Sequence, residues 1–463
     1  MLHPDGYKDR RVVLLGLARS GVAVAELFHR AGARVTVNDK KDRSACPEAA
    51  QLEALGISVI FGHHPEDLID ADVSLVVKNP GIPYSIQPIQ QALRLGIQVV
   101  TEVEVAHHIC PAPIIGITGS NGKTTTTTLV HLMLTESGKD AVVAGNIGRA
   151  LTEAALAAHP EQWIVAELSS FQLKGTVDFH PRIACLLNLY ETHLDYHETM
   201  EDYAASKSKL FRNLAPEDTA VMNWDDDYCR SLLPEIKAGV LPFSFKHSLE
   251  KGVYIERNHV VYADGSGTSH TIVPLSGIAM KGDFNVENAL AAAAVALSAG
   301  ADAAAIARVL SSFRGVEHRL EFVRELNGVS FYNNSKATNP AATIKSIEAF
   351  GDEPIVLICG GQDRKSEFME LLPVFRERVK AVVTLGETRF KLDHIAELAG
   401  LTKRKTVETE DMPETAIRQA VEAAYAFAEP GGVVLLSPAC ASWDMFPSYE
   451  ERGRMFKHSV HTL

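Results

Sequence analysis

The segment that most constrains the fold is residues 114–125, which read Ile-Ile-Gly-Ile-Thr-Gly-Ser-Asn-Gly-Lys-Thr-Thr. The apolar start predicts a buried strand, the glycines a tight turn, and Lys123-Thr124 the opening of a helix. Such a turn suits a triphosphate, because glycines admit phosphates to backbone N–H groups, the helix N-terminus and the lysine add positive charge, and the threonine hydroxyl can ligate Mg²⁺. Ile117 stands where the strict G-x-x-x-x-G-K-S/T pattern has its first glycine. We therefore predict a nucleotide site of a variant type rather than a Gly-rich turn with a surface lysine.

Length and composition limit the class of protein. A chain of 463 residues has room for about three domains. Its formal charge of −13 argues against a nucleic-acid partner but does not exclude a small anionic substrate. The first six residues lack the layout of a signal peptide, and the longest apolar run, 289–297, is too short to span a bilayer. The six cysteines form no C-x-x-C pair, so we expect reduced thiols in a cytoplasmic protein without a membrane partner.

Three apolar strands run into Gly-rich turns, at 12–16, 114–119 and 355–361. Alternating strand and helix patterns surround each of them, which predicts three α/β units. Two prolines break regular structure in the segment 108–113, and a second break falls near Arg314-Gly315-Val316. We expect domains at 1–110, 111–316 and 317–463.

The first unit carries Gly-Leu-Ala-Arg-Ser-Gly at 16–21 after a strand, and Asp39 at the end of the next strand. This resembles a dinucleotide-binding fingerprint in which Ala18 replaces the middle glycine. That glycine allows close approach of a pyrophosphate, so its loss weakens an NAD interpretation. A general anion-binding turn is the favoured alternative.

Polar residues of the second unit follow its strands. Glu167 to Ser170 follows one strand and Asn188 to Asp195 another, which makes a carboxylate and an imidazole available as metal ligands. A loop histidine can also be merely solvated. Lys207 and Lys209, on a helix predicted at 200–214, are by themselves typical of a solvated basic face.

Three polar loops are expected to follow strands of the third unit, at 333–340, 360–365 and 437–444. The carboxyl ends of strands in an open α/β sheet are the usual side for ligands. Lys336, Thr338 and Lys365 can hold a carboxylate or a phosphate. Cys440 is interpreted as a buried thiol rather than a nucleophile, since no partner histidine is indicated.

Together these strings resemble the ATP-dependent Mur ligases of peptidoglycan synthesis, in family order over nearly the whole chain. The motifs are Gly-Leu-Ala-Arg-Ser-Gly (16–21), Val-Lys-Asn-Pro-Gly-Ile-Pro (77–83), Thr-Gly-Ser-Asn-Gly-Lys-Thr (118–124), Gly-Asn-Ile-Gly (145–148), Glu-Leu-Ser-Ser-Phe-Gln-Leu (167–173), His-Arg-Leu-Glu (318–321), Ser-Lys-Ala-Thr-Asn-Pro (335–340) and Ser-Pro-Ala-Cys-Ala-Ser (437–442). The strings at 335–340 and 437–442 resemble the family member that adds D-glutamate.

The resemblance implies a three-domain α/β fold with a Rossmann-like N-terminal domain for a UDP-sugar, a central P-loop ATPase-type domain and a Rossmann-like C-terminal domain for D-glutamate. It implies that ATP drives the joining of D-glutamate to UDP-N-acetylmuramoyl-L-alanine through an acyl phosphate, giving ADP and phosphate. Two Mg²⁺ ions and a carbamylated lysine are the implied cofactors, and we expect a monomer.

Residue roles carried over from the family motifs follow the same order. The implied catalytic residues are Lys123, Lys207, His193 and Lys336. The implied ATP-binding residues are Gly119, Ser120, Asn121, Gly122, Lys123, Thr124, Thr125, Asn285 and Arg319. The implied substrate-binding residues are Leu17, Ala18, Arg19, Asp39, Lys40, Asn79, Gly81, Asn146, Ser169, Thr338, Lys365, Ser442 and Tyr449. The implied metal ligands are Thr124, Glu167, His193 and Lys207 as a carbamate.

The chain departs from the family pattern at Asn334, where many relatives carry aspartate, so a role assigned to that acid does not transfer. The segment 362–365 also varies, and Arg364 is an alternative to Lys365.

Two other classes of protein remain open from the residues alone. An NAD-dependent oxidoreductase would use the first unit, and a non-catalytic ATP-dependent switch would not need the loops of the third. Folylpolyglutamate synthetase shares the nucleotide loop but lacks the first unit.

Overall fold

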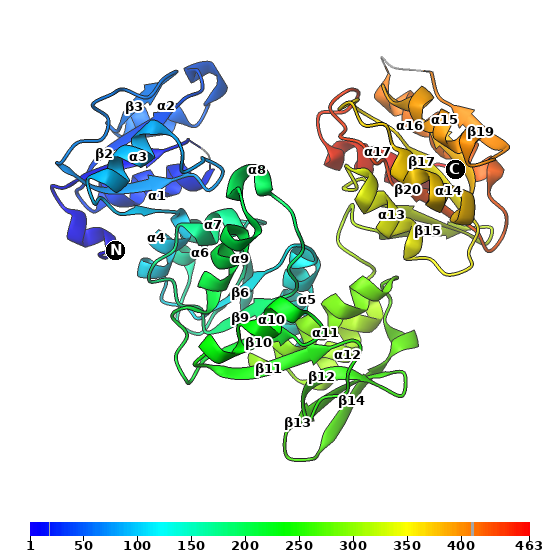
Figure 1. The fold of residues 1–463 in the computed structure, drawn as a ribbon, viewed down its shortest axis with the longest axis horizontal. Helices are drawn as coiled ribbons and strands as arrows, with labels where there is room; N and C mark the ends of the chain where they lie inside the picture. The colour runs from blue at the N-terminus through cyan, green and yellow to red at the C-terminus, as the bar shows by residue number, and fades with distance from the viewer. Residues whose placement is uncertain (18, 409–411) are drawn as a thin grey trace. The chain divides into compact units, whose positions relative to one another are not determined.

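The computed structural model describes residues 1–17, 19–408 and 412–463, which form three β-sheets with flanking helices (Figure 1). The chain divides into two compact units, residues 1–277 with 287–311 and residues 278–286 with 312–463. The first unit holds two of the sheets and the second unit holds the third. The predicted α/β fold with three units is thus confirmed as three sheets, whereas the domain boundaries stay predictions.

The N-terminal sheet is parallel, in the order β3-β2-β1-β4-β5. Its strands are β1 (Arg11–Leu15), β2 (Arg34–Asp39), β3 (Ser58–Phe61), β4 (Val73–Lys78) and β5 (Val99–Val100). Its helices are η1 (Pro4–Tyr7), α1 (Arg19–Arg30), η2 (Arg43–Ala45), α2 (Ala49–Ala54), α3 (Gln87–Arg94) and α4 (Glu102–Ile109). Val12 and Leu14 pack into one core cluster and Val13 and Leu15 into another, as the two-residue period of a strand buried on both faces requires.

The central sheet has nine strands in the order β14-β13-β12-β11-β10-β9-β6-β8-β7. Its strands are β6 (Ile114–Thr118), β7 (Ala141–Gly145), β8 (Trp163–Glu167), β9 (Ile183–Leu186), β10 (Thr219–Asn223), β11 (Gly239–Ser244), β12 (Lys251–Glu256), β13 (His259–Asp264) and β14 (Ser269–Pro274). Neighbours from β7 to β12 pair in parallel, and β13 and β14 add the antiparallel hairpins that the Gly- and Ser-rich stretch predicts. The strand before the nucleotide loop, β6, lies between β8 and β9.

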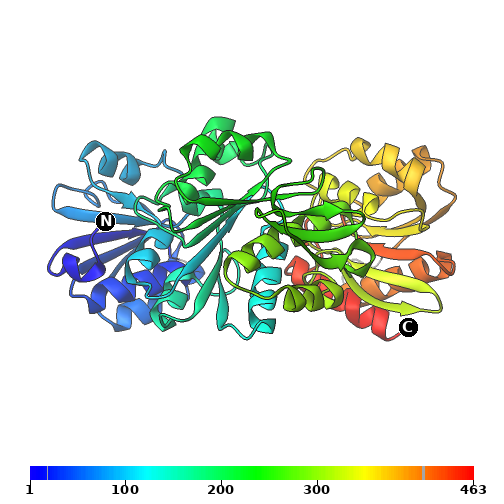
Figure 2. The same cartoon turned by 90° about the horizontal axis from the view of Figure 1, so that it is seen from below.

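Helices cover both faces of this sheet (Figure 2). They are α5 (Lys123–Glu136), α6 (Leu151–Ala157), α7 (Ser170–Lys174), α8 (Leu194–His197), α9 (Met200–Ser208), η3 (Lys209–Phe211), α10 (Asp227–Ser231), η4 (Leu233–Glu235) and η5 (Leu275–Gly277), followed by α11 (Asp283–Ser298) and α12 (Ala303–Ser312). The apolar run of α11 is buried, as expected. The helix predicted at 200–214 is wrong in its length, because α9 ends at Ser208 and the chain tightens into a 3₁₀ turn.

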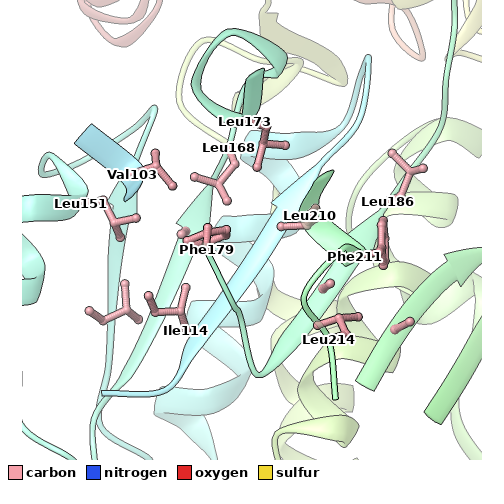
Figure 3. Packing of buried hydrophobic residues seen from close by; sticks show 14 of the residues in the cluster. Val103, Ile114, Leu151, Leu168, Leu173, Phe179, Leu186, Leu210, Phe211 and Leu214 are labelled. Carbon is pink, nitrogen blue, oxygen red and sulfur yellow. The ribbon is translucent and has the colours of Figure 1, made fainter. Parts of the chain in front are cut away.

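One hydrophobic cluster fixes α9 to the sheet. Leu210 and Phe211 of η3 lie in the same cluster as Ile114 of β6 and Phe179 (Figure 3). Leu210 packs where Gly116 has no side chain, since a Cβ at Gly116 would lie 2.6 Å from the Leu210 Cδ1 atom. This close packing holds the end of α9 against the strand that leads into the nucleotide loop.

The C-terminal sheet has the order β15-β16-β20-β17-β18-β19, with only β15 antiparallel to its neighbour. Its strands are β15 (Glu321–Leu326), β16 (Val329–Asn333), β17 (Ile355–Cys359), β18 (Val379–Thr384), β19 (Lys403–Thr406) and β20 (Val433–Leu436). Its helices are α13 (Pro340–Glu348), η6 (Met369–Leu371), α14 (Leu372–Arg378), α15 (Arg389–Leu398), α16 (Pro413–Phe427) and α17 (Tyr449–His461). The three predicted polar loops follow β16, β20 and β17, which are adjacent, so all three loops leave the same edge.

None of the described helices combines the length and the apolar character that crossing a bilayer requires. The six cysteines are all free thiols.

Candidate active site

The nucleotide loop, residues 119–122, joins β6 to α5 as the sequence predicts. Lys123, Thr124 and Thr125 form the first turn of α5, so their N–H groups face the loop. The Lys123 amine folds back over the loop and donates to the carbonyls of Gly119, at 2.8 Å, and Ser120, at 3.1 Å. A cation, a helix N-terminus and backbone N–H groups of the first helical turn therefore meet at one point, which is the arrangement that binds polyphosphates.

Neighbouring loops brace this turn. The Asn121 N–H donates to the Asn188 side chain at 2.9 Å. The Ser120 hydroxyl lies 2.8 Å from the Tyr203 hydroxyl and donates to the carbonyl of Tyr190 at 3.0 Å. In the sequence, Asn188 stands out only as part of a polar string, and Tyr203 belongs to none of the predicted site residues. Its position four residues before Lys207, on the same helix face, is the available signal.

Gly122 is a glycine for two separate reasons. Its φ is +84°, and a Cβ there would overlap the Asn288 side chain. We expect Gly122→Ala to lower the free energy of unfolding by more than the roughly 1–2 kcal/mol of a left-handed backbone and to weaken ATP binding. Gly138→Ala is the matched control, because Gly138 has φ +74° with open space around it. Thermal unfolding with and without ATP measures both effects, and equal losses in the two variants would contradict the role of Asn288.

Glu167, the last residue of β8, joins two other predicted residues, Thr124 and Asn146. Its Oε2 accepts the Thr124 hydroxyl at 2.7 Å, and its Oε1 accepts the Asn146 amide at 2.8 Å. The carboxylate is 2% exposed. A buried carboxylate beside a threonine hydroxyl at a phosphate loop is a donor set of the kind that Mg²⁺ prefers.

Lys207 is 1% exposed, so the solvated basic face that its sequence context suggested is wrong for this residue. Its amine donates to the Gly119 carbonyl at 2.8 Å and to the Thr118 hydroxyl at 3.3 Å. Burial, reinforced by the Lys123 cation and opposed by Glu167, lowers the pKa of Lys207 to about 6. The side chain is therefore a neutral amine at neutral pH, which sets it apart from an ordinary surface lysine.

His193 precedes α8 in a left-handed conformation with φ +59°. Its ring lies 5.0 Å from that of Phe171 and 6.3 Å from that of Tyr203, between centroids. Burial first, and then the Lys123 cation, lower the pKa of His193, against a smaller opposing effect of the Asp195 carboxylate. The imidazole is thus neutral, which is the form that can ligate a metal.

A cavity of about 340 Å³ opens beside Glu167. Four predicted substrate residues lie on its wall, namely Asn79, Gly81, Asn146 and Ser169. Glu102, Phe171 and Gln172, which are not among the predicted site residues, also line it. The Ser169 hydroxyl is oriented by Gln172, to which it donates at 3.0 Å within a capping box at the start of α7.

Other predicted residues lie at the carboxyl ends of β1, β2 and β4 in the N-terminal sheet. The Leu17 N–H donates to the Asp39 carboxylate at 2.6 Å, and the Gly81 N–H donates to the Asn79 side chain at 3.1 Å. Lys40 is exposed next to Asp39. Ala18 and the Arg19 side chain lie outside the described residues.

Lys78, at the end of β4, is a buried lysine that is not among the predicted site residues. Its amine donates to the Pro80 carbonyl at 3.0 Å and to the Tyr196 hydroxyl at 3.1 Å, joining the loop at the cavity to α8. Burial, with a smaller effect of the Lys174 cation, lowers the pKa of Lys78 to about 7.

This buried lysine makes stability depend on pH. Between pH 7 and 9 the unfolded chain holds the Lys78 proton and the folded chain releases it, so stability rises with pH, by up to roughly 2–3 kcal/mol. We expect Lys78→Met to remove this contribution, so that the stability of the variant rises less steeply between pH 7 and 9 than that of the wild type. Chemical unfolding of both proteins at pH 7, 8 and 9 tests the prediction, and parallel pH profiles would contradict it.

The remaining predicted site residues lie in the compact unit formed by residues 278–286 and 312–463. Most of them lie in or near the loops after β16, β17 and β20. The Lys336 amine lies 3.8 Å from the centroid of the Tyr449 ring. Ser442 is 2% exposed and Thr338 is partly buried, while Lys365 is exposed in a left-handed conformation with φ +64°. Cys440 is buried, and burial raises its pKa to about 11, which supports the interpretation as an inert thiol.

Three further predicted positions lie in this unit. The Arg319 N–H donates to the Val316 carbonyl at 2.9 Å, and the Asn285 side chain donates to the Lys281 carbonyl at 2.7 Å. Asn334 accepts the Leu320 N–H at 3.1 Å, so the residue that departs from the family pattern holds the segment after His318-Arg319.

The fold and these residues define a class of protein: a three-domain α/β enzyme with a P-loop-type triphosphate site and potential metal ligands. Family models agree with this along the chain. The Mur ligase MurD-like N-terminal domain matches residues 10–101, the Mur ligase middle domain 117–296, and the Mur ligase glutamate ligase domain 318–440.

Curated relatives match the chain end to end. A UDP-N-acetylmuramoylalanine–D-glutamate ligase of Geobacillus kaustophilus is 48% identical over 457 residues, covering 99% of this chain and 98% of the relative. The protein of the same name from Bacillus subtilis is 44% identical, covering 98% of each chain.

Solved structures share the fold. The UDP-N-acetylmuramate-alanine ligase MurC of Thermotoga maritima has a TM-score of 0.57 at 20% identity, and the match covers 98% of this chain and 99% of the MurC chain. The MurF ligase of the same organism, in complex with ADP, has a TM-score of 0.55 at 18% identity and covers 100% of this chain and 97% of its own.

This chain belongs to the Mur ligase family.

Proposed function

We propose that this protein is an ATP-dependent ligase that joins the amine of D-glutamate to the L-alanine carboxyl of UDP-N-acetylmuramoyl-L-alanine in peptidoglycan precursor synthesis, releasing ADP and phosphate. The observation that carries the proposal is the group formed by Thr124, Glu167 and Asn146 between the nucleotide loop and the cavity. The full-length relatives named for this reaction identify the substrates.

The chemistry follows from the weakness of a carboxylate as an electrophile. An oxygen of the L-alanine carboxylate attacks the γ-phosphorus of ATP, ADP leaves, and an acyl phosphate forms. The uncharged amine of D-glutamate then attacks the acyl carbon, and the tetrahedral intermediate expels phosphate and loses a proton. The first step brings two anions together, so fixed positive charge at the phosphates is the main catalytic requirement. Lys123 and the N-terminus of α5 supply such charge.

The donor set fits Mg²⁺. Thr124 and Glu167 would hold one ion and His193 the second, with Lys207 contributing as a carbamate. Bound Mg²⁺ would neutralise phosphate charge during transfer. As an amine, Lys207 has no anionic oxygen with which to ligate Mg²⁺. Its neutral nitrogen can add CO₂, which gives a carbamate and releases one proton. The buried amine and its low pKa support this modification.

The other site residues keep the roles that the family motifs imply. Leu17, Asp39 and the neighbouring residues of the N-terminal sheet bind the uridine end, and Asn146 and Ser169 contact the muramoyl-alanine part. Asn285, Arg319 and Lys336 act on ATP, and Thr338, Lys365, Ser442 and Tyr449 bind D-glutamate. A monomeric state and a cytoplasmic location also stay predictions.

Phosphate release tests the proposed function. With ATP, Mg²⁺ and UDP-N-acetylmuramoyl-L-alanine present, we expect release with D-glutamate and almost none with L-glutamate or without amino acid. ATP hydrolysis indifferent to both substrates would contradict the proposal and favour a nucleotide-dependent switch.

A further inference from the structure

The first turn of α17 carries a buried cation that none of the motifs includes. Arg452 is 1% exposed. Its Nε donates to the Ser335 hydroxyl at 3.0 Å, and its Nη2 donates to the carbonyls of Ser335, at 2.9 Å, and Cys440, at 3.1 Å. Its Nη1 donates to the Ala441 carbonyl at 3.5 Å. One guanidinium thus ties the loop after β16 to the loop after β20.

A third loop also closes on this side chain. A Cβ at Gly361 would lie 3.2 Å from the Arg452 Nη1 atom, so the glycine leaves room for the guanidinium. The next residue, Gln362, donates its N–H to the Ala441 carbonyl at 2.9 Å. The loops after β16, β17 and β20 therefore all meet around Arg452.

Each of these loops carries a predicted site residue within a few positions of the contact. Lys336 directly follows Ser335, and Ser442 directly follows Ala441. Ser335 also donates its hydroxyl to the Tyr449 carbonyl at 2.7 Å, which links the same loop to the start of α17. A displacement of the guanidinium would consequently move Lys336 and Ser442, the cation and the hydroxyl that are predicted to bind ligands.

The charge of Arg452 is not neutralised by a direct partner. All four acceptors are uncharged oxygens, and among the described residues no carboxylate forms an ion pair with its guanidinium. Burial lowers its pKa only to about 10, so it remains protonated at neutral pH. The Asp444 carboxylate acts on the guanidinium electrostatically without forming an ion pair with it. A buried cation whose hydrogen bonds all go to uncharged oxygens raises the local potential and favours an anionic ligand.

We propose that Arg452 is a positioning residue of the amino-acid site, which holds the three loops in register and adds positive potential that favours a dicarboxylate amino acid. The proposal rests on the proposed function, which makes that ligand D-glutamate. Arg452 acts through the loops and does not itself touch the substrate.

The test compares KM values for all three substrates in Arg452→Gln, Arg452→Lys and the matched control Arg454→Gln. Arg454 lies on the same helix, is 60% exposed at its side chain and pairs with Glu451. We expect Arg452→Gln to raise the KM for D-glutamate at least about tenfold, as loss of charged hydrogen bonds implies. The KM for ATP, on which the neighbouring Lys336 is proposed to act, should rise less, and the KM for UDP-sugar should stay nearly unchanged. Arg452→Lys should recover part of the loss because it keeps the charge, and Arg454→Gln should match the wild type.

Ser335→Ala provides a second variant in case the arginine variants fail to fold, since it removes one acceptor and keeps the cation. We expect a smaller rise in the same KM, of about threefold. The role of Arg452 would be overturned if the wild type is active and Arg452→Gln has an unchanged KM for D-glutamate. If only Ser335→Ala folds, an unchanged KM in that variant would have the same meaning. An equal rise in the KM values for all three substrates would also overturn the role. A wild type without D-glutamate-dependent release would instead remove the proposed function, and with it the ligand named here.

Discussion

Lys207→Ala is expected to lose at least about 10³-fold of the D-glutamate-dependent phosphate release, a loss typical of removing a main electrostatic element of a site. The amine is buried against the nucleotide loop, 2.8 Å from the Gly119 carbonyl, and as a carbamate it would place an anionic ligand there. Steady-state rates at saturating substrates measure the loss.

If Lys207 acts as a carbamate rather than as an amine, the activity of Lys207→Ala should respond to added carboxylic acids. The Lys207→Ala variant leaves a buried space, and a short carboxylic acid such as propionate can place its own carboxylate in it. We expect added propionate to restore a measurable part of the activity. Lys209→Ala is the matched control, because the Lys209 amine donates instead to the carbonyls of Lys174 and Thr176. Rescue by propylamine but not by propionate would contradict the carbamate.

Glu167→Gln is expected to lower kcat about 10²-fold and to raise the Mg²⁺ concentration for half-maximal rate at least about tenfold. The substitution keeps the shape of the side chain and one acceptor oxygen. The Thr124 hydroxyl can turn to accept from the new amide, so the local hydrogen bonds survive while the charge is lost. Magnesium titrations of the steady-state rate separate the two effects.

Glu136→Gln is the control for this substitution. Glu136 lies at the far end of α5 and pairs with Arg308 at 2.6 Å. Its loss should leave the magnesium dependence unchanged. If Glu167→Gln showed the magnesium profile of the wild type, Glu167 would not be a metal ligand.

The sequence predicts the three sheets and the location of the candidate site for one physical reason. Strands with buried apolar residues are recognisable, and polar strings such as the one after β8 fall where parallel strands end. Because β7, β8, β6 and β9 are adjacent, their loops lie together. The sequence did not predict β3, a partly buried strand at the sheet edge.

Other features depend on packing between distant segments, which local patterns do not report. The burial of Lys207 depends on Leu210 filling the space beside Gly116. The contact of Lys78 with Tyr196 spans 118 residues, and that of Arg452 with Ser335 spans 117. A single lysine or arginine in a polar helix or after a strand gives no sign of such a partner, and charged residues of this kind are mostly exposed.

Isotope transfer tests the central claim most directly. UDP-N-acetylmuramoyl-L-alanine labelled with ¹⁸O in its alanine carboxylate would be incubated with ATP, Mg²⁺ and D-glutamate, and the released phosphate analysed by mass. An acyl phosphate requires one ¹⁸O atom to pass from the carboxylate to phosphate at each turnover, and only when D-glutamate is present. Release of unlabelled phosphate would show that water or another group accepts the γ-phosphoryl group, and it would contradict the ligase mechanism.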